Sequence, residues 1–129
     1  MQAMRGIKLR LYPDEEQQAG IRLCCDASRF VWNKVLEHCE SSHVLGLPMP
    51  RMFSEKRLLV PLKKAEPWLR DAESTSLHQS VMNVFKAYER AFKNVRLGRI
   101  VSKQRKDGKY HNKYGFPRYK SAKEHTQSY

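Results

Sequence analysis

Residues 77 to 95 read LHQSVMNVFKAYERAFKNV and hold the clearest periodicity in the chain. Apolar side chains recur there at steps of four, three, four, four and three residues, so they share one face of an α-helix. The members of this face are Leu77, Val81, Val84, Tyr88, Phe92 and Val95. We expect Ser74 or Thr75 to cap the start of this helix and Gly98 to end it. The stretch therefore predicts a helix that packs into a helical core.

A longer helix is predicted near the start of the chain. Asp14 begins the sequence DEEQ, in which Gln17 stands where a capping box requires Glu or Gln. From there to about Ser41, small and apolar residues recur at helical spacing. These residues are Gly20, Cys24, Ala27, Val31, Val35 and Cys39.

The segment between these two helices predicts a shorter third one. Ser54 is suited to cap a helix that carries Leu58, Leu59 and Leu62. Pro61 must lie in the first turn of that helix, kink it or end it, because proline has no backbone N–H. Glu66-Pro67 then predicts a break in the chain.

The first residues predict a β-strand. Apolar and basic side chains alternate from Gly6 to Tyr12, with Ile7, Leu9 and Leu11 on the inward face. Together with the helices, this strand predicts a fold class that is mainly α with minor β.

Composition and charge narrow the class of partner. The 129 residues fit one domain, and the formal net charge of +12 favours a polyanion, either nucleic acid or an anionic membrane surface. Ten of the 25 Lys and Arg residues lie in residues 95–129, against two of the 13 acids. No apolar run reaches the roughly 18 residues that a bilayer span needs. The three cysteines, without a signal peptide, predict reduced thiols in a cytoplasmic protein.

The last part of the chain is predicted to be a segment that binds anions. Helical periodicity is lost from Arg99 onward, and the sequence KDGK at residues 106–109 is typical of a turn. Aromatic residues then alternate with cations, which combines charge for phosphates with flat rings for bases. For Phe116 and Tyr119, packing on the helices and contact with bases both stay open.

No catalytic centre is predicted in this chain. The acids lie mostly at helix ends or among basic neighbours, where caps and surface charge explain them. Cys39 and His43 are four residues apart, but a structural zinc site needs two such ligand pairs. We therefore expect no catalytic residue, no metal ligand and no cofactor.

Five short motifs follow one another along the chain. They are R-L-Y-P-x-x-x-Q at residues 10–17, R-F-V-W-N at 29–33, L-K-K-x-x-P-W-L at 62–69, A-F-K-N at 91–94 and G-F-P-R-Y-K-S at 115–121. In this order they resemble the N-terminal region of the TnpB family, also called OrfB-type transposases. Full-length members of that family are RNA-guided DNA endonucleases related to type V CRISPR effectors.

The resemblance implies a domain plan. Residues 1–13 would be the first strand of a wedge-type β-barrel, and residues 14–97 a helical recognition domain of the helix-turn-helix type. Residues 98–129 would be a basic aromatic extension that returns toward an incomplete barrel. In the family a RuvC nuclease domain follows, so the ending at Tyr129 indicates a fragment, a truncated reading frame or a reused domain.

The resemblance and the charge pattern together predict the contact residues for DNA and RNA. The family reads its transposon-adjacent DNA motif at positions that correspond to Phe53, Ser74, Thr75, His78 and Gln79. His78 stands where a glutamine is frequent, so the motif that is read stays open. Charge and aromatic character add Lys86, Arg90, Lys93, Arg99, Lys103, Arg105, Lys106, Lys109, Lys113, Tyr114, Arg118, Tyr119, Lys120 and Lys123.

Two residues of the motif R-F-V-W-N are expected to be structural. Trp32 is expected in the core of the first helix, and Asn33 is expected to bond across helices. A nuclease-less remnant would act as a DNA-binding repressor, or would pair with a second copy or with a missing nuclease segment through the open strand edge at residues 7–12.

Overall fold

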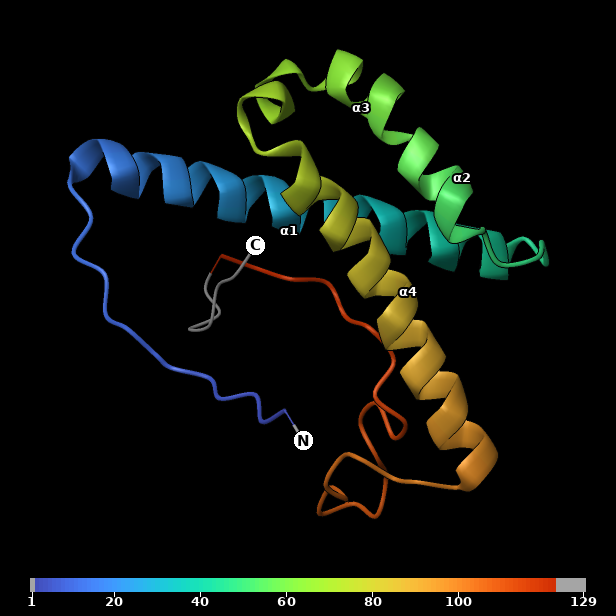
Figure 1. Cartoon of the computed structure of the whole chain (residues 1–129). Coiled ribbons are helices and arrows are strands. Elements are labelled where there is room, and N and C mark those ends of the chain that lie inside the picture. Colours follow the sequence, from blue (N-terminus) through green and yellow to red (C-terminus); the bar gives the residue numbers. More distant parts are fainter. Residues whose placement is uncertain (1, 123–129) are drawn as a thin grey trace.

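The computed structural model describes residues 2–122, which form four α-helices and one 3-10 helix. The helices are α1 (Glu15–Val44), α2 (Met52–Arg57), α3 (Leu59–Ala65), η1 (Pro67–Asp71) and α4 (Ser74–Leu97). In Figure 1, α4 crosses α1, and the chain after α4 turns back toward α1. The predicted three-helix arrangement is thus present, with the middle helix in two pieces.

The predicted capping box at the start of α1 is confirmed. The Gln17 N–H donates to Asp14 Oδ1 at 2.8 Å, and the Asp14 N–H donates to Gln17 Oε1 at 3.0 Å. These reciprocal bonds satisfy two backbone donors that a helix end otherwise leaves open. The helix runs to Val44, a little beyond the predicted end at Ser41.

The core lies where α1 and α4 meet. Ala27, Val31 and Val35 of α1 share one buried cluster with Val81 and Val84 of α4. Leu59 of α3 and Leu69 of η1 belong to the same cluster. Removal of this apolar surface from water is the main stabilising contribution to the fold.

The end of α4 is as predicted, and its start is not. Gly98 ends the helix with a φ of 64°, a left-handed conformation that costs glycine little. The N-cap is Glu73, and neither Ser74 nor Thr75 caps the helix, because both lie within its first turn. The apolar face is buried at Leu77, Val81 and Val84, whereas Phe92 is 47% exposed.

The middle helix is broken at Leu58. Ser54 lies inside α2, whose N-cap is Arg51, so the prediction that Ser54 begins the helix is wrong. Pro61 lies in the first turn of α3, where its missing N–H breaks no helical hydrogen bond. Pro67 begins η1, as the predicted break requires.

A contact between a histidine and a buried carboxyl group joins α2 to α1. His38 Nδ1 of α1 lies 2.5 Å from Glu55 Oε1, and Glu55 is only 2% exposed. Burial raises the pKa of Glu55, and the neighbouring His38 partly opposes that rise.

The predicted strand and the wedge-type β-barrel are wrong. Residues 2–122 contain no β-strand, and their only β-bridge joins Gln104 to Tyr110. Ile7, Leu9 and Leu11 are 78%, 81% and 74% exposed, and Figure 1 shows this N-terminal arm (residues 2–14) leading away from the helices. A strand needs a neighbouring strand to pair its N–H and C=O groups, and no described segment provides one. The described part of the chain is therefore a helical bundle with two irregular segments.

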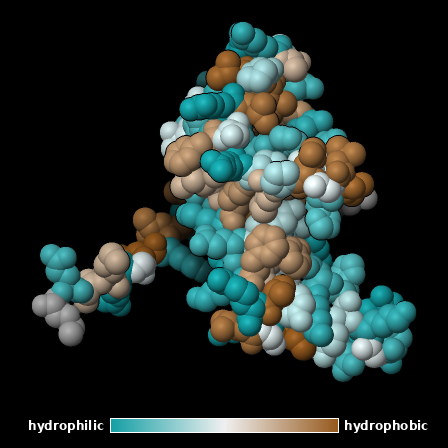
Figure 2. All heavy atoms as spheres, turned by 90° about the vertical axis from the view of Figure 1, so that its right-hand side faces the viewer, coloured by the Kyte–Doolittle hydropathy of each residue, from teal (hydrophilic) through white to brown (hydrophobic). Residues whose placement is uncertain are grey.

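The surface around the end of α1 is partly apolar. Val44, Leu45 and Leu47 are 83%, 72% and 56% exposed. Figure 2 looks onto this side of the molecule and shows hydrophobic side chains among hydrophilic ones. None of the helices within residues 2–122 combines the length and the apolar character of a membrane span.

Candidate nucleic-acid interface

A short irregular segment, residues 112–121, lies against the helices and is called the strap below. It begins with Asn112, whose side chain brackets Phe116: Asn112 Nδ2 donates to Phe116 O, and the Phe116 N–H donates to Asn112 Oδ1, both at 2.7 Å. Gly115 has a φ of 75°, which favours glycine. The strap thus has its own local turn before it reaches the helices.

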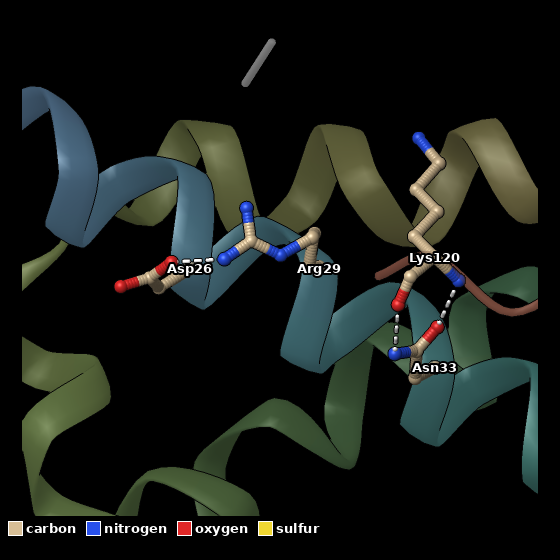
Figure 3. A network of polar contacts seen from close by, with 4 residues as sticks. All are labelled: Asp26, Arg29, Asn33 and Lys120. Carbon is tan, nitrogen blue, oxygen red and sulfur yellow. Dashed lines mark hydrogen bonds and ion pairs between the residues drawn. The ribbon is translucent and has the colours of Figure 1, made fainter. Parts of the chain in front are cut away.

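Three side chains of α1 and α4 hold the backbone of the strap. Asn94 Nδ2 donates to Tyr114 O at 3.1 Å, and Trp32 Nε1 donates to Arg118 O at 2.8 Å. Asn33 makes two bonds with Lys120, one from Asn33 Nδ2 to Lys120 O at 3.0 Å and one from the Lys120 N–H to Asn33 Oδ1 at 2.9 Å. Figure 3 shows this pair. The motifs R-F-V-W-N and G-F-P-R-Y-K-S are therefore two halves of one structural unit.

Sequence reasoning missed this unit. Trp32 is buried, as expected, but its ring nitrogen also anchors the strap. Asn33 bonds to the strap and not to another helix, so that expectation is wrong. A signal was present in the sequence, since both motifs combine aromatic residues with polar side chains that need partners.

Aromatic packing adds to the hold on the strap. The Phe116 ring lies 5.5 Å from the Phe92 ring and 6.2 Å from the Tyr88 ring, between centroids, so Phe116 packs on α4. The Tyr119 hydroxyl donates to Glu40 Oε2 at 2.8 Å, while the residue stays 49% exposed. Burial and this hydrogen bond raise the pKa of Tyr119 to about 12.

The basic side chains of residues 98–122 are mostly without acidic partners. Within this range the one ion pair joins Arg105 to Asp107 at 3.5 Å. Lys113 Nζ lies 5.3 Å from the Tyr110 ring centroid and 5.6 Å from that of Tyr114. The predicted cations in the described part of this segment are Arg99, Lys103, Arg105, Lys106, Lys109, Lys113, Arg118 and Lys120. Lys123 lies outside the described residues.

The predicted motif-reading residues gather at the start of α4. Ser74, Thr75, His78 and Gln79 are all exposed on its first two turns. Lys63 of α3 also lies there, since Lys63 Nζ donates to Ser74 Oγ at 3.1 Å. Sequence reasoning missed this cation.

Phe53 and the later cations of α4 are exposed as well. Phe53 is 70% exposed on α2, which packs against α4. Lys86, Arg90 and Lys93 are exposed at spacings of four and three residues, so they share one face of α4. The first turns of α4, this cationic face and the strap therefore belong to one helical body.

No metal centre is evident in the described residues, where no group of three or more His, Cys, Asp or Glu side chains is placed to hold an ion. Cys39 is 5% exposed, and burial, Glu55 and Glu40 raise its thiol pKa to about 11. At neutral pH this thiol is protonated and a poor metal ligand or nucleophile.

Comparisons with known proteins agree with the motifs. A family model described as a helix-turn-helix domain, of the OrfB type, matches residues 1–44, which comprise the arm and all of α1. The chain is also 32% identical over 98 residues to InsQ of Escherichia coli (strain K12), named as a candidate RNA-guided DNA endonuclease. The chain belongs to the TnpB family. This TnpB-type chain corresponds to the N-terminal region of the family, which makes it a nucleic-acid-binding, transposase-type module.

The matched lengths differ between relatives. The alignment with InsQ covers 72% of this TnpB-type chain and 24% of InsQ. The virulence protein VsdF of Salmonella dublin is 29% identical over 117 residues, which cover 82% of this chain and 97% of VsdF. No solved structure matches the chain.

Proposed function

We propose that this chain contacts both a guide RNA and the transposon-adjacent DNA motif as the N-terminal module of a TnpB-like protein. The observation that carries the proposal is the docking of the strap, which joins a set of cations to the same rigid body as the exposed first turns of α4. The residues proposed to read the DNA sequence and those proposed to hold phosphates therefore have fixed positions relative to one another.

The first turns of α4 are suited to base edges. Ser74, Thr75, His78 and Gln79 are short or medium polar side chains that donate and accept hydrogen bonds, and all are exposed. Phe53 offers an exposed ring that can lie against a sugar or a base. These residues are proposed to read the DNA motif.

The cations of residues 99–120 are suited to phosphates. They lack acidic partners apart from Arg105 within the described residues, so contact with a polyanion need not break ion pairs first. Such contacts release counterions and give affinity without sequence preference. These residues, with Lys86, Arg90 and Lys93, are proposed to hold the backbone of RNA, of DNA, or of a heteroduplex.

A longer parent protein is proposed to be the RNA-guided DNA endonuclease, with this module serving recognition only. A helix-turn-helix module of this kind is not itself a nuclease. The 129-residue chain is expected to leave DNA uncut in the presence of Mg²⁺, and cleavage in a gel assay would contradict this division of labour.

A second candidate is a nuclease-less module that binds DNA as a repressor or interacts with another protein. The specific observation in its favour is VsdF, of which 97% is covered by this chain, so the module has a relative of similar extent. Binding to DNA in the absence of any RNA, at physiological salt, would favour this candidate over the guide-dependent one.

The test is a titration of the chain with duplex DNA and with structured RNA at several salt concentrations. The logarithm of the affinity should fall linearly with the logarithm of salt, by about 0.9 per phosphate contacted on a duplex. Replacement of Lys86, Arg90 and Lys93 by Gln should reduce that slope, whereas Arg57→Gln and Lys64→Gln, exposed cations of α2 and α3, should leave it unchanged. Affinity that does not respond to salt would contradict the proposal.

The reading residues need a separate measurement. His78→Ala and Gln79→Ala should reduce the preference among DNA sequences and leave the salt slope unchanged. Selection from a randomised duplex library measures this preference, and an unchanged preference in both variants would remove these residues from the reading site.

A further inference from the structure

A small polar hollow lies where α1, the start of α4 and the strap meet. Its volume is about 80 Å³, which is room for a group a few times larger than a water molecule. Its lining includes Ser28 and Arg29 of α1, Ser76, Gln79 and Asn83 of α4, and Lys120 of the strap.

One residue of the lining has a buried hydroxyl without a hydrogen-bond partner. Ser28 is 7% exposed, and its Oγ is among the few buried polar atoms without a partner in the described residues. Ser80, which also lines the hollow, donates its own hydroxyl to Ser28 O at 2.7 Å. A buried hydroxyl without a partner lowers the stability of the fold. A ligand that accepts a hydrogen bond from Ser28 would therefore stabilise it.

The charge of the lining is positive. It includes Arg29 and Lys120 and no carboxylate. Arg29 forms an ion pair with Asp26 (Figure 3). Lys120 Nζ lies 4.1 Å from the ring centroid of Trp32. Since Lys120 has no ion pair within the described residues, its charge is available to an anion.

The neutral side chains of the lining also offer donors. Gln79 Nε2 donates to Asn83 Oδ1 at 2.8 Å, which leaves the Nδ2 group of Asn83 available as a donor. Ser76 lies in the first turn of α4, where the helix dipole favours a negative group. Ser76 Oγ is itself engaged with Glu73 Oε2 at 3.4 Å.

We infer that this hollow binds a single phosphate group, which Lys120 and Arg29 attract and which accepts hydrogen bonds from Ser28 Oγ and Asn83 Nδ2. The phosphate comes from a nucleic-acid backbone or from a free phosphate, since both offer the same tetrahedral oxygens. The inference rests on the proposed function only if the phosphate belongs to a nucleic acid.

Binding in the hollow is coupled to the strap. Lys120 lines the hollow only while Asn33 holds the Lys120 backbone with its two hydrogen bonds. A phosphate group therefore stabilises the docked strap, and bound phosphate should slow trypsin cleavage after Arg118 and Lys120.

The first experiment uses the full chain and inorganic phosphate, with ionic strength held constant by chloride. The melting temperature of the wild type should rise and saturate with phosphate, and Ser28→Ala and Lys120→Gln should each weaken the apparent affinity by about tenfold. Ser28→Ala removes an unpaired hydroxyl, so without phosphate it should fold as stably as the wild type. Ser41→Ala, an exposed serine of the same helix, and Lys64→Gln, an exposed cation of α3 outside the hollow, should change the phosphate response by less than about twofold.

A wild type that does not respond saturably to phosphate would overturn the inference, and so would a Ser28→Ala variant that responds like the wild type. Because Ser28→Ala and Lys120→Gln change different groups, partial loss of strap docking in one of them leaves the other as a test. Either negative result would leave the salt-dependent binding of oligonucleotides, and with it the proposed function, untouched.

The second experiment identifies the source of the phosphate. In a competition titration, inorganic phosphate should displace a short duplex or RNA from the wild type more effectively than from Ser28→Ala at equal ionic strength. Such a difference assigns the hollow to a nucleic-acid backbone. Saturable binding of inorganic phosphate without that difference assigns the hollow to a free phosphate and confirms the site itself.

Discussion

The N-terminal arm and the strap are alike in sequence and opposite in structure. Both alternate apolar or aromatic side chains with cations, neither forms regular secondary structure, and both were expected at a β-barrel. In the arm, Ile7, Leu9 and Leu11 are mostly exposed, and a contact between Arg10 and the Tyr12 ring at 5.5 Å stays within the arm itself. The strap is held along its length by side chains of α1 and α4.

The difference teaches that an irregular segment is ordered by the groups that meet it. The carbonyl groups of Tyr114 and Arg118 accept hydrogen bonds from Asn94 and Trp32, and the Lys120 N–H donates to Asn33 Oδ1. These side chains belong to helices that are already packed. The arm is tied to α1 near its capping box, where Gln18 Nε2 donates to Pro13 O at 3.2 Å. Alternation of residue types is therefore not enough to predict which segment docks.

Trp32→Ala should have the largest effect, because it removes a core ring and the anchor for Arg118 together. We expect a loss of about 3–5 kcal/mol in the free energy of unfolding, measured by urea denaturation. Trp32→Phe keeps most of the ring and loses the hydrogen bond, so it should cost less, about 1 kcal/mol beyond any change in packing. Equal costs for the two variants would show that the ring contributes little.

Gly115→Ala tests the turn that starts the strap. Alanine at a φ of 75° is strained, and its Cβ would meet Val101 Cγ2 at 3.0 Å, so we expect a loss of about 1–2 kcal/mol in urea denaturation. Gly20→Ala, inside α1 with open space around it, should instead stabilise by about 0.5–1 kcal/mol. If Gly115→Ala were as stable as the wild type, the strap turn would not exist in solution.

Asn33→Ala and Gln18→Ala compare the side-chain hydrogen bonds that hold the strap with the one that holds the arm. Loss of both bonds to Lys120 should cost about 1–2 kcal/mol and speed trypsin cleavage after Arg118 and Lys120. Gln18→Ala removes the side-chain bond to the arm and should change stability by less than about 0.5 kcal/mol. Similar trypsin rates in the wild type and Asn33→Ala would contradict strap docking.

High pH should release part of the strap. The pKa of Tyr119 is raised to about 12 in the folded chain, above its ordinary value of 10.0, so its contribution to stability is fully present below pH 10. That contribution is lost as the pH rises toward 12, because the ionised phenol no longer donates to Glu40. The ultraviolet absorbance of ionised tyrosine should be measured against pH in the wild type and in Tyr119→Phe. The difference between the two curves should show one phenol that ionises near pH 12. A phenol that ionises near pH 10 would show that Tyr119 does not bond to Glu40.

Deletion of residues 2–10 should have the smallest effect. These residues are exposed, so the free energy of unfolding should change by less than about 0.5 kcal/mol in urea denaturation. A Leu9→Ser variant serves as the matched point change. A loss of more than about 1 kcal/mol in either would show that the arm packs on the body and would erase its contrast with the strap.

The helices were predictable because local rules decide them. The capping box at Asp14 and Gln17 and the left-handed residue at Gly98 act within a few residues, so the sequence pattern is sufficient. Leu77, Val81 and Val84 were predicted as core because helical spacing alone places them on one face. The division of the chain at residues 13 and 97 stays a prediction, as do the proposed contacts with DNA and RNA.

The strap was not predictable in the same way, because its partners lie far away in the sequence. The bonds from Trp32 to Arg118 and from Asn33 to Lys120 span 86 and 87 residues. The polar hollow likewise requires Ser28, Asn83 and Lys120 to meet, and each comes from a different segment.

The sequence by itself determined where α1 begins and where α4 ends, which residues of α4 enter the core at Leu77, Val81 and Val84, and that a surplus of cations follows α4. The tertiary structure decided which of two similar irregular segments is held and which side chains close a polar hollow. The physical reason is range: caps and helical faces depend on neighbours within a few residues, whereas docking depends on backbone groups that meet fixed donors and acceptors only after the helices have packed.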